Sequence, residues 1–213
     1  MTPKEKALGN VPEAQRWVGA SINALNAVIG FNGRRSEIAN LSQFKALQTH
    51  FHVELGPAPS TLDQLLSLLP FVDEADPTLR ILIEIRFRYF DILSALGKAS
   101  SAFTDAPAGG GDEDTGMAPA FVPQKRDGTF RITPYYLSIG ALSQVHCLVH
   151  ESAHFVSDAF QDFAYRDRSG AESDDPDKYK KLPVQFAIRN ADSYAYFALQ
   201  MAKGIDRILS RDE

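Results

Sequence analysis

The pentapeptide His150-Glu151-Ser152-Ala153-His154 constrains the fold of this chain more than any other feature. It lies in a mostly apolar context, with residues 145–149 before it and Phe155-Val156 after it. Residues four positions apart lie on one face of a helix, about one turn apart. The spacing therefore predicts a helix from Ile139 to about Phe160, with both imidazoles on the same side.

Two imidazoles at this spacing indicate a metal site. Neutral imidazole nitrogens suit Zn²⁺, and a zinc ion lowers the pKa of its water toward about 7. Glu151 follows the first histidine and reaches that water without binding the ion, which suits a general base. A catalytic zinc also needs a third protein ligand and an open position.

The residues themselves leave the third ligand open, because no third histidine follows His154. On a continuing helix Asp158 lies a further turn away, about 6 Å along the axis. Asp162 returns to the metal if the helix ends near Phe160. Glu172 and Asp192 are more distant candidates.

The remaining chain predicts an α+β fold that is mostly helical. Helical periodicity covers residues 11–29, 36–46, 78–103 and 183–209. A loose polar start is expected over residues 1–10. Within 78–103, a strand over 81–90 is the alternative. A β-hairpin is expected around Asp127-Gly128, between 120–123 and 130–133. We expect one domain with a helical part at 1–104, a mobile acidic glycine-rich loop at 105–119 and a zinc-binding part at 120–213.

Charge and composition exclude several other classes of protein. The net charge of −5 argues against a general nucleic-acid binder, and no apolar run reaches the roughly 18 residues of a membrane span. The only cysteine, Cys147, permits no internal disulfide. The first residues lack the apolar stretch of a signal peptide. We therefore expect a cytoplasmic protein, or one secreted by a route without a cleavable signal; the sequence does not indicate an oligomeric state.

Two further motifs follow the pentapeptide: D-x-x-Y at Asp162–Tyr165 and N-A-D-S-Y at Asn190–Tyr194. Together the three resemble the aspzincins, the zinc peptidase family of deuterolysins and peptidyl-Lys metalloendopeptidases. The resemblance covers about residues 118–200 and implies a zincin-like metallopeptidase domain with a small hairpin before the zinc helix. By the same resemblance, Asp162 becomes the third zinc ligand, Tyr165 assists the transition state and Asp192 lines the substrate pocket.

The sequence also departs from the family pattern. Ala159-Phe160 replaces Gly-Thr, and Arg166 stands in place of a closing glycine. Ala195 occupies the position of a glutamate that helps to hold the substrate lysine in the Lys-specific members. Strict lysine specificity is therefore not expected.

The sequence thus predicts a zinc-dependent metalloendopeptidase, with His150, His154 and Asp162 as ligands, that hydrolyses protein or peptide substrates through a zinc-activated water. Two alternatives remain open. One is a catalytically silent zincin-fold binding module, suggested by the departures at Ala159-Phe160 and Ala195. The other is a peptidase effector or toxin exported without a signal peptide.

Overall fold

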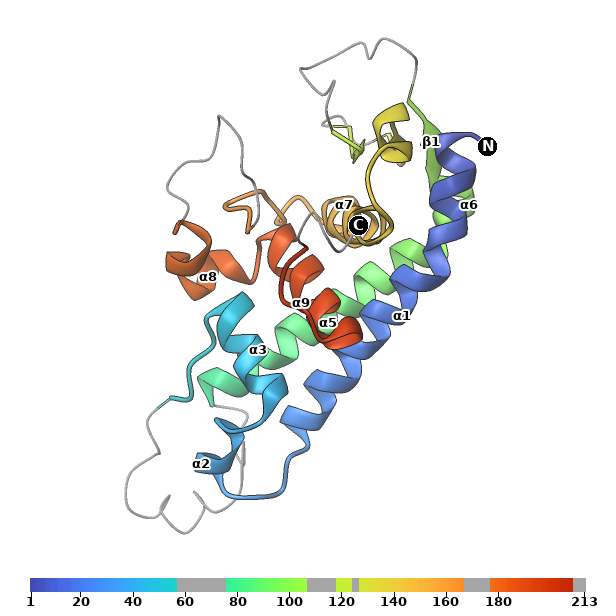
Figure 1. The fold of residues 1–213 in the computed structure, drawn as a ribbon. Coiled ribbons are helices and arrows are strands. Elements are labelled where there is room, and N and C mark those ends of the chain that lie inside the picture. The colour runs from blue at the N-terminus through green and yellow to red at the C-terminus, as the bar shows by residue number, and fades with distance from the viewer. Residues whose placement is uncertain (57–75, 107–117, 124–126, 167–176, 209–213) are drawn as a thin grey trace.

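The chain folds into a mostly helical domain with one small sheet, as the sequence predicts (Figure 1). The structure, a computed structural model, describes residues 1–56, 76–106, 118–123, 127–166 and 177–208. Two long helices, α1 (Pro3–Ile29) and α5 (Pro77–Gly97), lie side by side, and α7 (Ala141–Val156) and α9 (Ala191–Lys203) pack against them.

Helix α1 begins eight residues before the position that its apolar periodicity predicts. The Thr2 hydroxyl accepts from the Glu5 N–H, the Glu5 carboxylate accepts from the Thr2 N–H, and Pro3 occupies the first turn. This capping box satisfies two N–H groups that a helix start otherwise leaves unpaired. The expected loose start over residues 1–10 is therefore wrong.

Helix α5 settles the choice between helix and strand over residues 81–90. Asp76 accepts hydrogen bonds from the N–H groups of Thr78 and Leu79, which fixes the start of the helix. Tyr89 lies fully buried and donates from its hydroxyl to the Tyr194 carbonyl of α9 at 2.8 Å. The predicted helix over 36–46 is instead two helices, α2 (Arg35–Ile38) and α3 (Ser42–Phe51).

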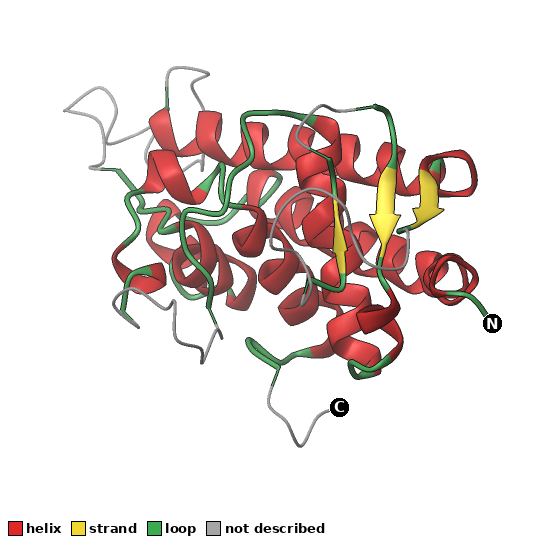
Figure 2. Cartoon of the chain, turned by 90° about the horizontal axis from the view of Figure 1, so that it is seen from above, coloured by secondary structure: helices red, strands yellow, loops and turns green. Residues whose placement is uncertain are grey.

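The sheet has three short strands, in the order β1 (Phe103–Asp105), β3 (Phe130–Ile132), β2 (Ala120–Phe121). The antiparallel pairing of β2 with β3 confirms the expected hairpin. Strand β1 pairs with β3 in parallel, with the Phe103 and Phe130 rings 4.5 Å apart, whereas the sequence predicts that residue 103 ends a helix. The sheet lies at one end of the helices (Figure 2), and β2 forms an edge that contacts α7.

Two more of the predicted helices also have different bounds. Helix α7 ends at Val156, four residues before the predicted end. The last helical segment, expected over 183–209, is interrupted at residues 188–190. The remaining short elements are α6 (Ala99–Ala102), η1 (Pro134–Leu137), η2 (Tyr179–Lys181) and α8 (Val184–Ala187).

A single apolar cluster joins the long helices. It includes Trp17 of α1, Tyr89 of α5, Leu148 of α7 and Phe197 of α9, all fully buried. The division at 1–104, 105–119 and 120–213 stays a prediction, and most of its middle segment lies outside the described residues. None of the helices in the described ranges has the length and hydropathy that crossing a bilayer requires.

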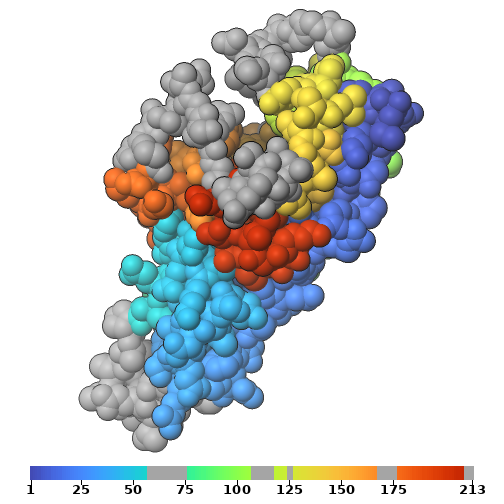
Figure 3. All heavy atoms as spheres, viewed as in Figure 1, coloured from blue at the N-terminus to red at the C-terminus, as the bar shows by residue number. Residues whose placement is uncertain are grey.

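His50 links α3 to the C-terminal third of the chain, where α9 lies against α3 (Figure 3). Its side chain is fully buried, with Nδ1 2.9 Å from the Tyr179 hydroxyl and Nε2 2.8 Å from Gln200 Oε1. Because Gln200 Oε1 only accepts, Nε2 carries the proton and the Tyr179 hydroxyl donates to Nδ1. Burial, aided by the positive charge of Arg166, lowers the pKa of His50 from 6.5 to about 3.

This buried imidazole predicts a loss of stability in acid. Between the two pKa values the unfolded chain binds a proton that the folded chain does not, so stability falls as the pH drops below about 6.5. From pH 7 to pH 4 this one group removes about 3 kcal/mol. We expect His50→Gln to show a decrease smaller by about this amount, measured by urea unfolding at both pH values. An equal decrease in both proteins would contradict the assignment.

Candidate metal centre

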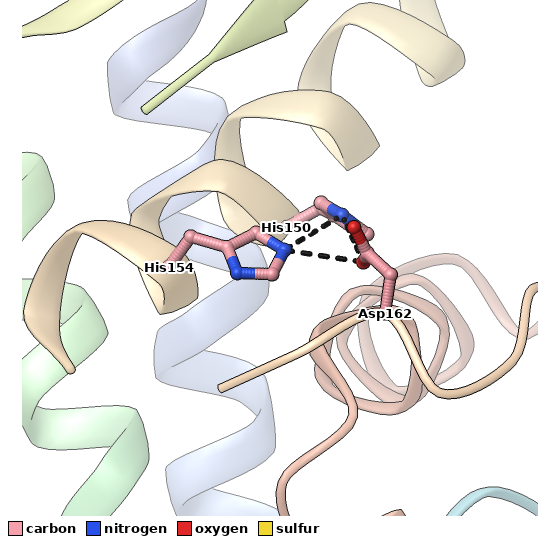
Figure 4. A group of neighbouring side chains, drawn as sticks. All are labelled: His150, His154 and Asp162. Carbon is pink, nitrogen blue, oxygen red and sulfur yellow. Dashed lines mark hydrogen bonds and ion pairs between the residues drawn. The ribbon is translucent and has the colours of Figure 1, made fainter. Parts of the chain in front are cut away.

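Three side chains bring their ligand atoms to one point (Figure 4). His150 Nε2 lies 3.0 Å and His154 Nε2 3.1 Å from Asp162 Oδ1, and the two nitrogens are 3.3 Å apart. The imidazoles project from successive turns of α7, and Asp162 faces both from the loop beyond the helix. Among the described residues, these three form the group of His, Cys, Asp and Glu side chains suited to one ion.

The end of α7 brings Asp162 back to the helix. Ser157 is extended (φ −159°, ψ 139°), so the chain leaves the helix axis directly after Val156. Phe160 is then buried at 3% exposure and packs edge-on against Tyr194 of α9, with ring centroids 5.0 Å apart. The chain therefore turns back toward α7. Because the helix ends before Asp162, this carboxylate reaches both histidines.

Asn190 holds this loop in place. Its side-chain oxygen accepts from the Ala164 N–H at 3.1 Å, and its amide donates to the Ala164 carbonyl at 2.9 Å. A parallel bridge adds two backbone bonds, from Gln161 N–H to the Arg189 carbonyl and from Ala191 N–H to the Gln161 carbonyl. Sequence reasoning assigns Asn190 no role of its own. Its place in the N-A-D-S-Y motif at a helix start is the signal that points to it, but its side chain bonds the Ala164 segment instead of capping α9.

The charges at the site favour a cation between these groups. Burial alone lowers the pKa of His150, but the hydrogen bond and charge of Asp162 raise it well above the ordinary value. Burial raises the pKa of Asp162, and the two imidazoles lower it far below the usual range. Two imidazoles and one carboxylate are also a donor set of catalytic zinc, so the residues fit that ion.

Glu151 lies beside this group, its carboxylate 3.9 Å from His150 Nε2. Its side chain is 14% exposed, and burial raises its pKa. The backbone N–H of Val122, directly after β2, donates a hydrogen bond to this carboxylate. Glu151 therefore lies between the ligand group and the edge strand, where it can accept a proton.

The other predicted site residues lie at different places around the group. The Tyr165 ring stacks on His150, with centroids 5.9 Å apart and 13° between the planes. Asp192 is 2% exposed, and its Oδ1 lies 3.5 Å from His150 Nδ1. Asp158 is exposed and does not belong to the three-residue group. Glu172 lies outside the described residues.

Comparison with known proteins shows the fold. Neither the scan against protein-family models nor the search of curated proteins gave a match. Among solved structures, a zinc peptidase from Grifola frondosa is similar, with a TM-score of 0.54 and 18% sequence identity. The match covers 92% of this chain and 94% of that chain. The chain therefore has a zincin-like peptidase fold over nearly its whole length, as the sequence predicts.

Proposed function

We propose that this protein is a zinc-dependent metalloendopeptidase of the aspzincin type. The observation that carries the proposal is the meeting of His150 Nε2, His154 Nε2 and Asp162 Oδ1 around one point, with the Glu151 carboxylate beside it. The likeness to a zinc peptidase fold supports it. The three residues would hold Zn²⁺, which in such a site polarises a carbonyl and makes hydroxide available near neutral pH.

Glu151 acts as the general base and then as the general acid in this proposal. It accepts a proton from the attacking water as the new C–O bond forms at the scissile carbonyl. It then passes the proton to the amide nitrogen as the C–N bond breaks, so that an amine and a carboxylate leave. Its partly buried position between α7 and β2 suits both transfers, because burial disfavours a permanently charged carboxylate.

Tyr165 and the edge of the sheet complete the proposed site. The Tyr165 ring lies parallel to the His150 ring, with the centroids 5.9 Å apart, so this side chain is next to a proposed zinc ligand. A phenol there would donate to the negative oxygen of the tetrahedral intermediate. Among the described strands, β2 pairs on one side only, and an extended peptide substrate would add to its other edge as a strand.

Asp162→Ala tests the third ligand. Loss of an outer-shell partner weakens metal binding roughly 10–100-fold. We expect Asp162→Ala to weaken zinc binding by more than this, because the substitution removes a donor atom. Asp158→Ala, four residues earlier in the same loop, is the matched control and should bind zinc as the wild type does. Zinc affinity is measured by competition with a chelator. Equal affinities in the two variants would exclude Asp162 as the ligand.

Glu151→Gln separates metal binding from catalysis. The amide keeps the shape of the side chain but accepts no proton, so we expect one zinc per chain and a roughly 10²–10⁴-fold lower kcat. The measurement is hydrolysis of a mixed peptide library, with metal content determined on the same sample. Wild-type turnover in this variant would refute the mechanism, and a zinc-loaded wild type that cleaves no peptide would favour the binding-module alternative.

Tyr165→Phe removes only a hydroxyl. If Tyr165 donates to the oxyanion, kcat should fall by roughly 10²–10³-fold, as for other oxyanion donors, with little change in KM. Steady-state kinetics on one library peptide that the wild type cleaves gives both constants. A change confined to KM would show that Tyr165 contributes to substrate binding rather than to the transition state.

A further inference from the structure

Asp192 faces the zinc-ligand helix from the first turn of α9, and both of its oxygens have neighbours. Oδ1 lies 3.5 Å from His150 Nδ1 and 3.4 Å from His146 Nε2. Oδ2 accepts a hydrogen bond of 2.7 Å from the backbone N–H of Arg166. The residue is 2% exposed. Both oxygens of this buried carboxylate therefore contact groups of the protein.

His150 needs a partner at the ring nitrogen that does not face the other ligands. Its Nε2 points to Asp162 and His154. A neutral imidazole that offers Nε2 to a metal carries its proton on Nδ1, and the acceptor at Nδ1 fixes both this tautomer and the orientation of the ring. Asp192 Oδ1 is the carboxylate oxygen that faces His150 Nδ1, at a separation that is long for a hydrogen bond.

The position of Asp192 stabilises its negative charge. It lies in the first turn of α9, where the helix dipole and the unpaired N–H groups favour an anion. The short bond from Arg166 N–H adds a second stabilising contact. Since Arg166 directly follows Tyr165, the same carboxylate also ties the tyrosine segment to α9.

His146 contacts the same carboxylate oxygen as His150. Its ring lies 4.3 Å from the Tyr196 ring, and Asp192 Oδ1 lies between the two histidines of α7. The helix face that carries Asp192 next presents Ala195, which is fully buried. A substrate side chain would have to displace these packed groups to reach the carboxylate.

We propose that Asp192 is a positioning residue that holds the zinc-ligand His150 and the Tyr165 segment, rather than a residue that contacts the substrate. The inference rests on the proposed zinc site and departs from the pocket role that the aspzincin resemblance implies. It follows that no carboxylate on this face of α9 selects a basic side chain in the substrate. Substitution of Asp192 should therefore change zinc affinity and leave the preference for residues after the cut unchanged.

The test compares Asp192→Asn and Asp192→Ala with Gln200→Ala in the full chain. Gln200 is the matched control: it lies two turns further along α9, and its amide oxygen contacts His50 Nε2 rather than His150 or the Asp162 loop. The dissociation constant for zinc is measured by chelator competition. We expect a roughly 10–100-fold increase for both Asp192 variants, as for other outer-shell carboxylates, and less than a twofold change for Gln200→Ala. The near-isosteric Asn variant keeps the test valid if Asp192→Ala does not fold.

Two further measurements separate positioning from a purely structural effect. In ¹⁵N-histidine spectra of the zinc-loaded protein, the Nδ1–H proton of His150 should lie downfield, as expected for a bond to a carboxylate, and move upfield in Asp192→Asn. Cleavage of a peptide library should slow while the order of preferred residues after the cut stays as in the wild type.

The outcomes distinguish this inference from the proposed function. Wild-type zinc affinity in Asp192→Asn, with selective loss of cleavage before basic residues, would overturn the positioning role and leave the peptidase intact. Weaker zinc binding in the Asp192 variants of a protein that cleaves no peptide would uphold the positioning role and reject the peptidase. A wild type that binds no zinc would overturn both.

Discussion

The reversal of the chain after Val156 is the constraint on which the candidate site depends. A helix that continued to Phe160 would carry the following carboxylates away from His150 and His154 along its axis. Instead the chain turns at Ser157, and Asn190 binds the backbone of Ala164 through both ends of its amide. These two bonds join the loop to the start of α9, so the third ligand position depends on a helix about 30 residues further along the chain.

The parts of the fold that the sequence predicts well have local causes. The apolar stripes of α1, α5 and α7 and the Asp127-Gly128 turn each act within a few residues. The capping box at Thr2 and Glu5 is equally local. Hydrophobic periodicity does not reveal this helix start, because polar residues follow it. Strand β1 is different, because it pairs with β3, a strand far along the chain.

The candidate site likewise has some features with local causes and others that depend on long-range contacts. The i, i+4 spacing of His150 and His154 determines their common face without any tertiary contact. The choice between Asp158 and Asp162 has no local signal, since it depends on where α7 ends and on packing of Phe160 against Tyr194. The environment of Asp192 is harder still to predict from the sequence, because it combines groups of α7, the loop and α9.

The departures from the family pattern take part in the packing of the loop. Phe160, which stands in the expected Gly-Thr segment, is buried, with the Arg88 guanidinium 5.1 Å from its ring centroid. Arg166, at the position of the expected glycine, pairs with Asp206 at 2.6 Å and lies over the Tyr179 ring. Both side chains anchor the two ends of the segment that carries Asp162 and Tyr165. A large apolar anchor and a paired arginine restrict the loop by tertiary contacts, so these replacements are compatible with a closed ligand set and do not by themselves favour a silent module.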